Sequence, residues 1–214
     1  WSNELMRLYR RARREDEKTD RIEAILASAK NLLTTNTLDE CNLSIIASDV
    51  GITKAALYRY FRVKELIFLE IYRRELAVLA TALQEAFVNP QVTTLVDVLV
   101  QQPIFCKLTS ELGDVLEKPL TEEEAADFKL YVLQTFEPLS QQLSQQFGMD
   151  HAQVIALLMH INSAVVGCWK LSHPSPMMTA ALQRHEALLP FRLDFAHFLQ
   201  QHLTMLLGPM LPNH

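Results

Sequence analysis

The sequence contains little glycine and little cysteine. Only 5 of its 214 residues are Gly, and none belongs to a glycine-rich phosphate-binding loop. The three cysteines, Cys41, Cys106 and Cys168, are odd in number and widely separated. This usage argues against a framework of disulfide bonds and fits a reducing compartment, so we expect a cytoplasmic protein.

Long uncharged apolar stretches are missing too. No run reaches the roughly 18 uncharged apolar residues that indicate a membrane span, and no signal peptide is visible. The closest run, 152–169, contains His160, Asn162 and Ser163, and we interpret it as a buried helix. These polar residues suit either satisfied contacts in a core or interface, or contacts to a ligand inside a helical bundle. We expect no membrane partner.

Catalytic and metal-binding patterns are absent from the sequence. It lacks the G-x-S-x-G, H-E-x-x-H and C-x-x-C motifs that carry nucleophilic or metal chemistry. The seven histidines are scattered, and the spacing of His197 and His202 suits a shared metal on one helix poorly. We therefore predict a protein that is not an enzyme, with no catalytic residues, no metal and no cofactor.

The net charge changes sign along the chain. The whole sequence has a formal charge of −5, yet residues 1–64 carry 12 Lys/Arg against 9 Asp/Glu, a net of +3, and residues 65–214 carry 8 against 16, a net of −8. Only the N-terminal part can be drawn electrostatically to phosphates. A basic extension at 1–19 either contacts DNA or forms a solvated charged face. Its clustered arginines are Arg7, Arg10, Arg11, Arg13 and Arg14.

The segment 43–64 has the features of two short helices joined by a tight turn. Ile46, Ala47 and their apolar neighbours give the first helix one apolar face. Gly51 tolerates a positive φ, so it can end that helix in a turn. Thr53 is a suitable N-cap for a second helix, which we predict over 54–60 with Leu57 turned inward. This arrangement predicts a unit that reads DNA.

The exposed side of that second helix supplies candidate DNA contacts. Small side chains at Ala55 and Ala56 allow close approach to a groove floor and contact with a thymine methyl. Tyr58, Tyr60 and Lys64 are placed for phosphate contacts, which fix register rather than sequence; a role in the domain core is the alternative for the tyrosines. The predicted DNA-binding residues are Ser44, Thr53, Lys54, Ala55, Ala56, Tyr58, Arg59, Tyr60 and Lys64.

These residues stand in an order typical of one family. The motif consists of Ile46-Ala47, Gly51, Leu57-Tyr58-Arg59-Tyr60-Phe61 and Lys64-Glu65-Leu66. It resembles the N-terminal helix-turn-helix domain of TetR-family transcriptional regulators, and the resemblance covers residues 20–66. Two segments depart from the family pattern. Asn36-Thr37 stands where a glycine is usual, and the acidic Asp39-Glu40 is followed by Cys41-Asn42 where hydroxyl residues are common.

Helical periodicity in the rest of the chain predicts an all-α protein. We expect a three-helix DNA-binding domain at 20–66, joined by a long helix to a helical ligand-binding and dimerisation domain at 67–214. Helices at about 151–171 and 191–207 have apolar residues on two sides. One side can face the core and the other a partner subunit. We therefore expect a homodimer, with a monomer enclosing a large core as the alternative.

The faces of these two helices define the expected interface. The first helix has one apolar face of Ile155, Leu158, Met159, Val166 and Trp169, and another of Val154, Leu157, Ile161, Ala164, Val165 and Cys168. The main face of the last helix comprises Phe191, Phe195, Phe198, Leu199 and Leu206.

The family resemblance implies a ligand cavity in the C-terminal domain and hence a small-molecule effector. An apolar lining favours a largely apolar acyl, aromatic or drug-like effector, and a plain core is the alternative. The candidate lining residues are Phe105, Leu108, Phe128, Tyr131, Val132, Met159 and Asn162. Our hypothesis is a homodimeric, ligand-responsive repressor on a palindromic operator in double-stranded DNA. The alternative is a helical ligand- or protein-binding module that has lost DNA binding.

Overall fold

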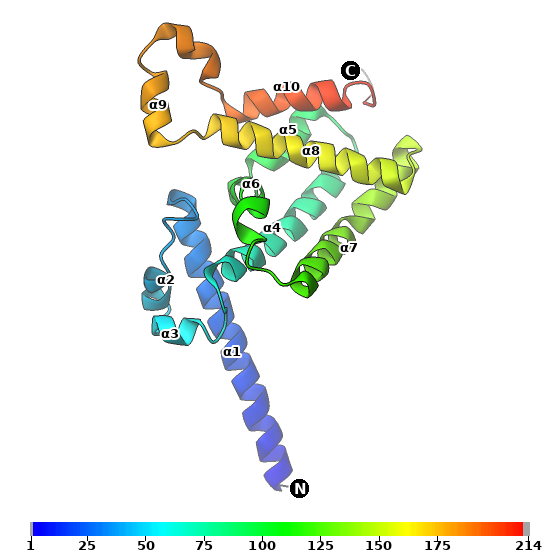
Figure 1. The fold of residues 1–214 in the computed structure, drawn as a ribbon. Helices are drawn as coiled ribbons and strands as arrows, with labels where there is room; N and C mark the ends of the chain where they lie inside the picture. The colour runs from blue at the N-terminus through cyan, green and yellow to red at the C-terminus, as the bar shows by residue number, and fades with distance from the viewer. Residues whose placement is uncertain (1, 212–214) are drawn as a thin grey trace. The chain divides into compact units, whose positions relative to one another are not determined.

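Helices make up all the regular structure in the part of the chain that can be described. A computed structural model describes the backbone of residues 2–211 and the side chains of residues 16–211. Its order is α1 to α6, the π-helix η1, α7 to α9, the 3-10 helix η2 and α10 (Figure 1). The all-α prediction is confirmed. The chain divides into two compact units, residues 1–71 and 72–214, and each is described here by itself.

The first unit is built on a long first helix. α1 spans Ser2–Thr35, α2 spans Leu43–Asp49 and α3 spans Lys54–Leu57; α4 (Lys64–Ala86) begins in this unit and continues into the second. Ile25, Ala29 and Leu33 on one stripe of α1 are fully buried, as the i, i+4, i+8 spacing of a core-facing helix requires. The predicted basic extension is the beginning of α1. The side chains of its arginines lie outside the described residues.

The second short helix is shorter than the sequence suggests. We predicted a helix over 54–60, but α3 ends at Leu57 and Tyr58 is its C-cap. The next residues form a tighter turn with i→i+3 hydrogen bonds. Arg59 N–H donates to Ala56 O at 3.1 Å, and Tyr60 N–H donates to Leu57 O at 2.9 Å. These i→i+3 bonds turn the chain toward α4 within a few residues.

The second unit is a bundle of longer helices. After α4 come α5 (Val92–Val100), α6 (Pro103–Ser110), η1 (Leu112–Leu116), α7 (Glu122–Phe147), α8 (His151–Ser172), α9 (Pro176–Leu182), η2 (Glu186–Phe191) and α10 (Phe195–Leu207). α8 packs against α6, α7 and α10, and α10 also packs against α5 (Figure 1). α8 is long and apolar enough to cross a membrane by length and composition. Only 33% of its most apolar stretch is buried, so the prediction of a buried helix holds for one side of α8, the side that packs against α6, α7 and α10.

Local capping chemistry sets the starts of several helices in this unit. Thr121 and Glu124 form a capping box at the start of α7, and Asp150 forms another with Gln153 at the start of α8. Gly148 ends α7 with a φ of 65°. α7 continues through Pro138 as one helix.

Two helices differ from their predicted extents. We expected one helix from Pro103 to about Lys118, whereas α6 ends at Ser110 and gives way to the π-helix η1. The last helix begins only at Phe195, capped by Asp194. Phe191 therefore lies in η2 and is 63% exposed, so its placement on the apolar face of the last helix was wrong.

Candidate DNA-binding surface and effector pocket

The turn between α2 and α3 is a glycine-capped helix end. Ile52 N–H donates to Ala47 O at 2.9 Å and Gly51 N–H donates to Ser48 O at 3.0 Å. Gly51 adopts a φ of 70°, the left-handed conformation that this paired pattern of hydrogen bonds requires. The Arg21 guanidinium of α1 donates to Val50 O at 2.7 Å. The end of α2 is therefore fixed both by its own turn and by α1.

The turn presents one side of α3 to solvent. Thr53 Oγ1 accepts the Ala56 N–H at 3.1 Å, which confirms Thr53 as the N-cap. Leu57 is fully buried, whereas Tyr58 is 45% exposed, so the core alternative does not describe Tyr58. The candidate contacts that are exposed are Ser44, Thr53, Lys54, Ala55, Tyr58 and Arg59, while Ala56, Tyr60 and Lys64 are half-buried.

The start of α2 is capped by an amide rather than by a hydroxyl. Asn42 is the N-cap, and its side-chain Oδ1 accepts the Ser44 N–H at 2.8 Å. The acidic segment before it has a structural use, because Glu40 Oε2 accepts the Thr37 N–H at 2.8 Å and Thr37 Oγ1 accepts the Glu40 N–H at 3.4 Å. The departures from the family pattern in this segment thus stabilise the turn leading into α2.

Lys64 has a partner inside its own unit. Its Nζ donates to the backbone carbonyl of Leu38 at 3.0 Å, and the side chain is partly buried. An ammonium group has three N–H donors, so this bond leaves donors for a phosphate. Lys64 therefore makes a structural contact, and its contact with DNA stays a prediction.

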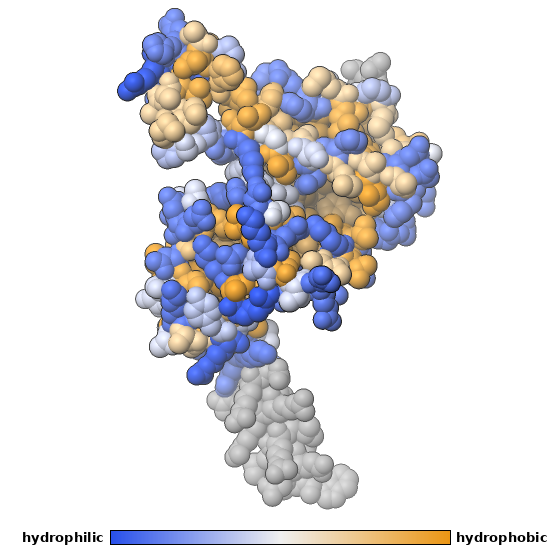
Figure 2. Space-filling view, viewed as in Figure 1, coloured by the Kyte–Doolittle hydropathy of each residue, from blue (hydrophilic) through white to orange (hydrophobic). Residues whose placement is uncertain are grey.

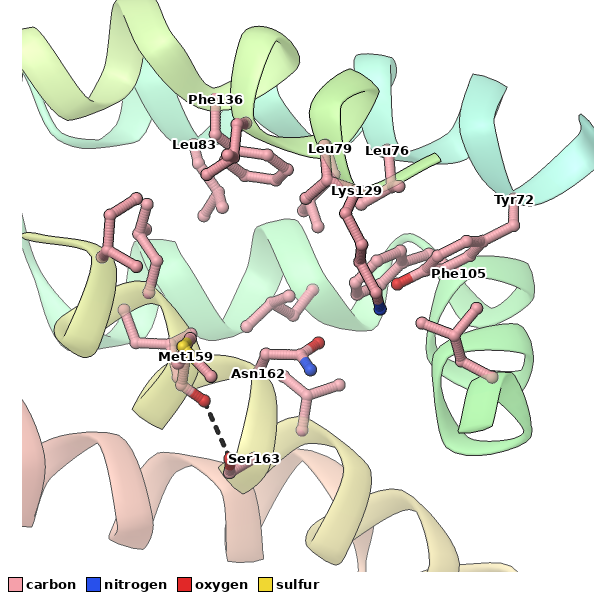
Figure 3. A pocket seen from close by; sticks show the side chains of 18 of the residues that line it. Tyr72, Leu76, Leu79, Leu83, Phe105, Lys129, Phe136, Met159, Asn162 and Ser163 are labelled. Atoms are coloured by element: carbon pink, nitrogen blue, oxygen red, sulfur yellow. Dashed lines mark hydrogen bonds between the residues drawn. The ribbon is translucent and has the colours of Figure 1, made fainter. Parts of the chain in front are cut away.

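A separate cavity lies within the second unit. Its volume is about 430 Å³, inside the range of roughly 300–1,000 Å³ that is typical of small-molecule sites. Figure 2 shows apolar residues around a recess in this unit, and Figure 3 shows the side chains that line it. The lining residues are Tyr72, Leu76, Leu79, Leu83, Leu99, Phe105, Leu112, Phe128, Lys129, Val132, Leu133, Phe136, Ile155, Leu158, Met159, Ile161, Asn162, Ser163 and Val165.

Comparison with known sequence families covers almost the whole described chain. Residues 25–71 match the family described as bacterial regulatory proteins, tetR family, and residues 70–211 match the one described as tetracyclin repressor-like, C-terminal domain. The chain belongs to the TetR family. It is accordingly a DNA-binding transcriptional regulator, and proteins of this family are regulators rather than enzymes. No curated protein matches the chain.

The cavity of this TetR-family protein contains some of the predicted effector contacts but not all. Phe105, Phe128, Val132, Met159 and Asn162 line it. Leu108 is fully buried in the core and does not line the cavity. Tyr131 lies outside as well; its hydroxyl donates to Arg73 O at 2.9 Å, and the Arg73 guanidinium lies 4.2 Å from its ring centroid.

Sequence reasoning missed the α4 side of the cavity and its single cation. The helical spacing of Leu76, Leu79 and Leu83 suits the core side of a long helix. Periodicity alone does not distinguish such a packed core from the cavity wall that these residues form. On α7, Lys129 shares a stripe with Val132, Leu133 and Phe136 at i, i+3, i+4 and i+7 spacing. A cation on an otherwise apolar stripe was a signal that could have identified Lys129.

A chain of hydrogen bonds crosses one end of the cavity. The Tyr72 hydroxyl donates to Thr109 Oγ1 at 3.0 Å, and the Thr109 hydroxyl donates to Asn162 Oδ1 at 3.0 Å. Burial raises the pKa of Tyr72 to about 12, so the phenol stays protonated and acts as the donor. Asn162 is therefore held by α6 through Thr109, and its carbonyl oxygen is already used.

The three cysteines of this TetR-family protein, Cys41, Cys106 and Cys168, are buried, and none of them forms a disulfide bond. Burial raises the pKa of the Cys106 thiol to about 12 and that of Cys168 to about 11, so neither forms the thiolate that redox sensing needs. Among the described residues, no group of three or more His, Cys, Asp or Glu could hold a metal ion.

Both apolar faces of α8 are used within its own unit. Val154, Val165 and Cys168 are buried in the bundle, while Ile155, Leu158 and Met159 line the cavity. Trp169 packs edge-on against Phe195 of α10 at 5.1 Å between centroids. The role of one apolar face of this helix at a partner subunit stays a prediction, and Met159 on that face is 66% exposed. A second exposed stripe consists mainly of small residues, namely Ala152, Ala156, His160, Ser163 and Gly167.

Proposed function

We propose that this TetR-family regulator is a ligand-responsive repressor that binds a palindromic operator as a homodimer in the cytoplasm. The observation that carries the proposal is the exposed side of α3, held in place by the Gly51 turn and the Arg21 bond. In helix-turn-helix proteins the second helix enters the major groove, and a dimer spans two half-sites. Lys54, Ala55 and Arg59 are the exposed groups that would meet base edges and phosphates.

Ligand response is supported by the apolar cavity of the second unit. Its lining is almost entirely aliphatic and aromatic, which favours a largely apolar effector. Such an effector changes DNA affinity only if it binds the DNA-competent and incompetent states of the dimer unequally. The cavity walls come from α4 to α8 and η1, so occupancy can alter how these helices pack.

Dimerisation is supported by the exposed stripe of small residues on α8. Ala156, Ser163 and Gly167 leave little side-chain bulk along one side of a long helix. Two copies of such a helix can approach closely and bury their backbones and Cβ atoms against each other. The neighbouring exposed side of α10, including Gln201 and Thr204, would add polar contacts at the rim.

A gel-shift titration with the DNA upstream of the chain's own gene tests the proposal. We expect one retarded species at nanomolar to micromolar protein that survives competition by unrelated DNA. Retardation that unrelated DNA abolishes equally well would favour the alternative, a helical ligand- or protein-binding module that has lost sequence-specific DNA binding.

A further inference from the structure

The effector cavity has one charged group in an otherwise apolar lining. Its only ionisable lining side chains are Lys129 and Tyr72, and Tyr72 stays neutral because burial raises its pKa to about 12. Lys129 extends from α7 toward the middle of the cavity in Figure 3, and its Nζ lies 5.4 Å from the centroid of the Phe128 ring. None of the described residues that line the cavity carries a carboxylate; the carboxylate that pairs with Lys129, that of Glu117, lies outside the lining. Any formal charge on the described lining residues is therefore positive.

The second polar group of the lining is also a donor. Asn162 Oδ1 already accepts the Thr109 hydroxyl at 3.0 Å, and that hydroxyl is the acceptor for Tyr72. Within the described residues, the Asn162 amide nitrogen has no hydrogen-bond partner. Ser163 donates to Met159 O at 2.8 Å. The side-chain donors left to meet a ligand are thus the ammonium of Lys129 and the amide N–H of Asn162, and Ser163 keeps only acceptor capacity.

Lys129 is held by an ion pair that a ligand can replace. Its Nζ lies 2.5 Å from Glu117 Oε1, and the two side chains are 59% and 27% exposed. Ion pairs this open to solvent contribute little net free energy, because water competes with both partners. Glu117 itself does not line the cavity; it is the C-cap of η1. An incoming anion can therefore exchange with Glu117.

We propose that the cavity takes an amphipathic anion, with an apolar chain or ring system and one carboxylate-like head. The head would pair with Lys129 in place of Glu117 and accept an N–H from Asn162. The apolar part would lie among Leu79, Leu83 and Phe136. The inference rests on the proposed ligand response and names the chemical class of the ligand.

Three ten-carbon probes that differ only in the head group test the inference. Decanoate, 1-decanol and decyltrimethylammonium are titrated into the full chain by calorimetry, below their aggregation limits. We expect decanoate to bind about threefold to tenfold more tightly than decanol. Lys129→Met should remove that difference and leave decanol binding unchanged. Glu117→Gln, which removes the competing carboxylate, should strengthen decanoate binding and again leave decanol unchanged.

Other outcomes separate the possible errors. Equal binding of decanoate and decanol, or tighter binding of the cation, overturns the anion assignment while leaving an effector cavity intact. If Lys129→Met loses binding of both decanoate and decanol, Lys129 has a packing role. That result also overturns the anion assignment. If none of the probes binds, both the assignment and the ligand response fail. The gel shift without ligand still reports on DNA binding alone.

Discussion

Gly51 shows how a single backbone conformation builds the DNA-reading unit. Its φ of 70° lets two N–H groups return to α2 and points the chain into α3. A Cβ at Gly51 would meet no atom within 4 Å, so space is not the constraint there. Only the cost of the left-handed conformation favours glycine at this position.

Gly51→Ala should therefore destabilise the protein by about 1 kcal/mol. The measurement is chemical unfolding followed by circular dichroism. Gly51→Asn is the matched control, because Asn tolerates the left-handed region better, and it should cost less. Equal stability of the wild type and Gly51→Ala would mean that the turn relaxes to a negative φ.

The structural contact of Lys64 and its predicted phosphate contact can be followed by two separate measurements on one variant. In Lys64→Ala the affinity for all DNA sequences should fall, and the plot of log affinity against log salt should flatten by about one unit. The bond to Leu38 O is lost as well, so stability should drop by about 1 kcal/mol. Salt-dependent DNA titrations and thermal unfolding measure the two effects.

Lys64→Arg is the control for Lys64→Ala, because it keeps the charge. It should largely restore the salt slope. A Lys64→Ala protein with lower stability but unchanged affinity and slope would leave Lys64 with its structural role only.

At the scale of whole elements, the parts of the fold set by local chemistry were predictable from the sequence. Thr53, Thr121 and the glycine turn indicate where helices begin or end, because a capping side chain bonds to backbone groups within three residues of it in the sequence. The π-helix η1 was not predictable, since the sequence after Ser110 remains compatible with a continuing helix. The sequence also did not predict which neighbours pack against each apolar face of α8, because periodicity shows which faces are apolar but not what covers them.

The exposed stripe of α8 makes a specific prediction about assembly. Gly167 has open space around it, since an added Cβ meets no atom within 4 Å. Gly167→Glu should therefore keep the fold, yet a charged side chain would be trapped in a dimer interface on this stripe. We expect at least a tenfold weaker dimer, measured by analytical ultracentrifugation.

Ala126→Glu, at an exposed position on α7, is the matched control and should leave the dimer intact. A Gly167→Glu protein that dimerises like the wild type would place the interface elsewhere. Exposed apolar residues of α9 and η2, such as Met177 and Leu189, would then be the next surface to test.

At the scale of the whole molecule, the sequence predicted the two-part character of the chain better than it predicted the cavity. The opposed charges of residues 1–64 and 65–214 agree with a DNA-binding unit and a unit of different character. The cavity residues were predicted in part, because Phe105 and Phe128 look the same in a core as in a cavity wall. The α4 leucines emerged only from the packing of α4, α7 and α8, whereas Lys129 stands on an otherwise apolar stripe in the sequence.

Selection from a pool of randomised duplexes tests whether α3 reads a specific palindromic site. For the wild type, we expect an enriched consensus with two-fold symmetry and half-sites about 10 base pairs, or a multiple of that, apart. Lys54→Ala should keep the symmetry and change the preferred bases within each half-site. No enrichment by the wild type, or a consensus without two-fold symmetry, would mean that α3 does not read a palindromic site.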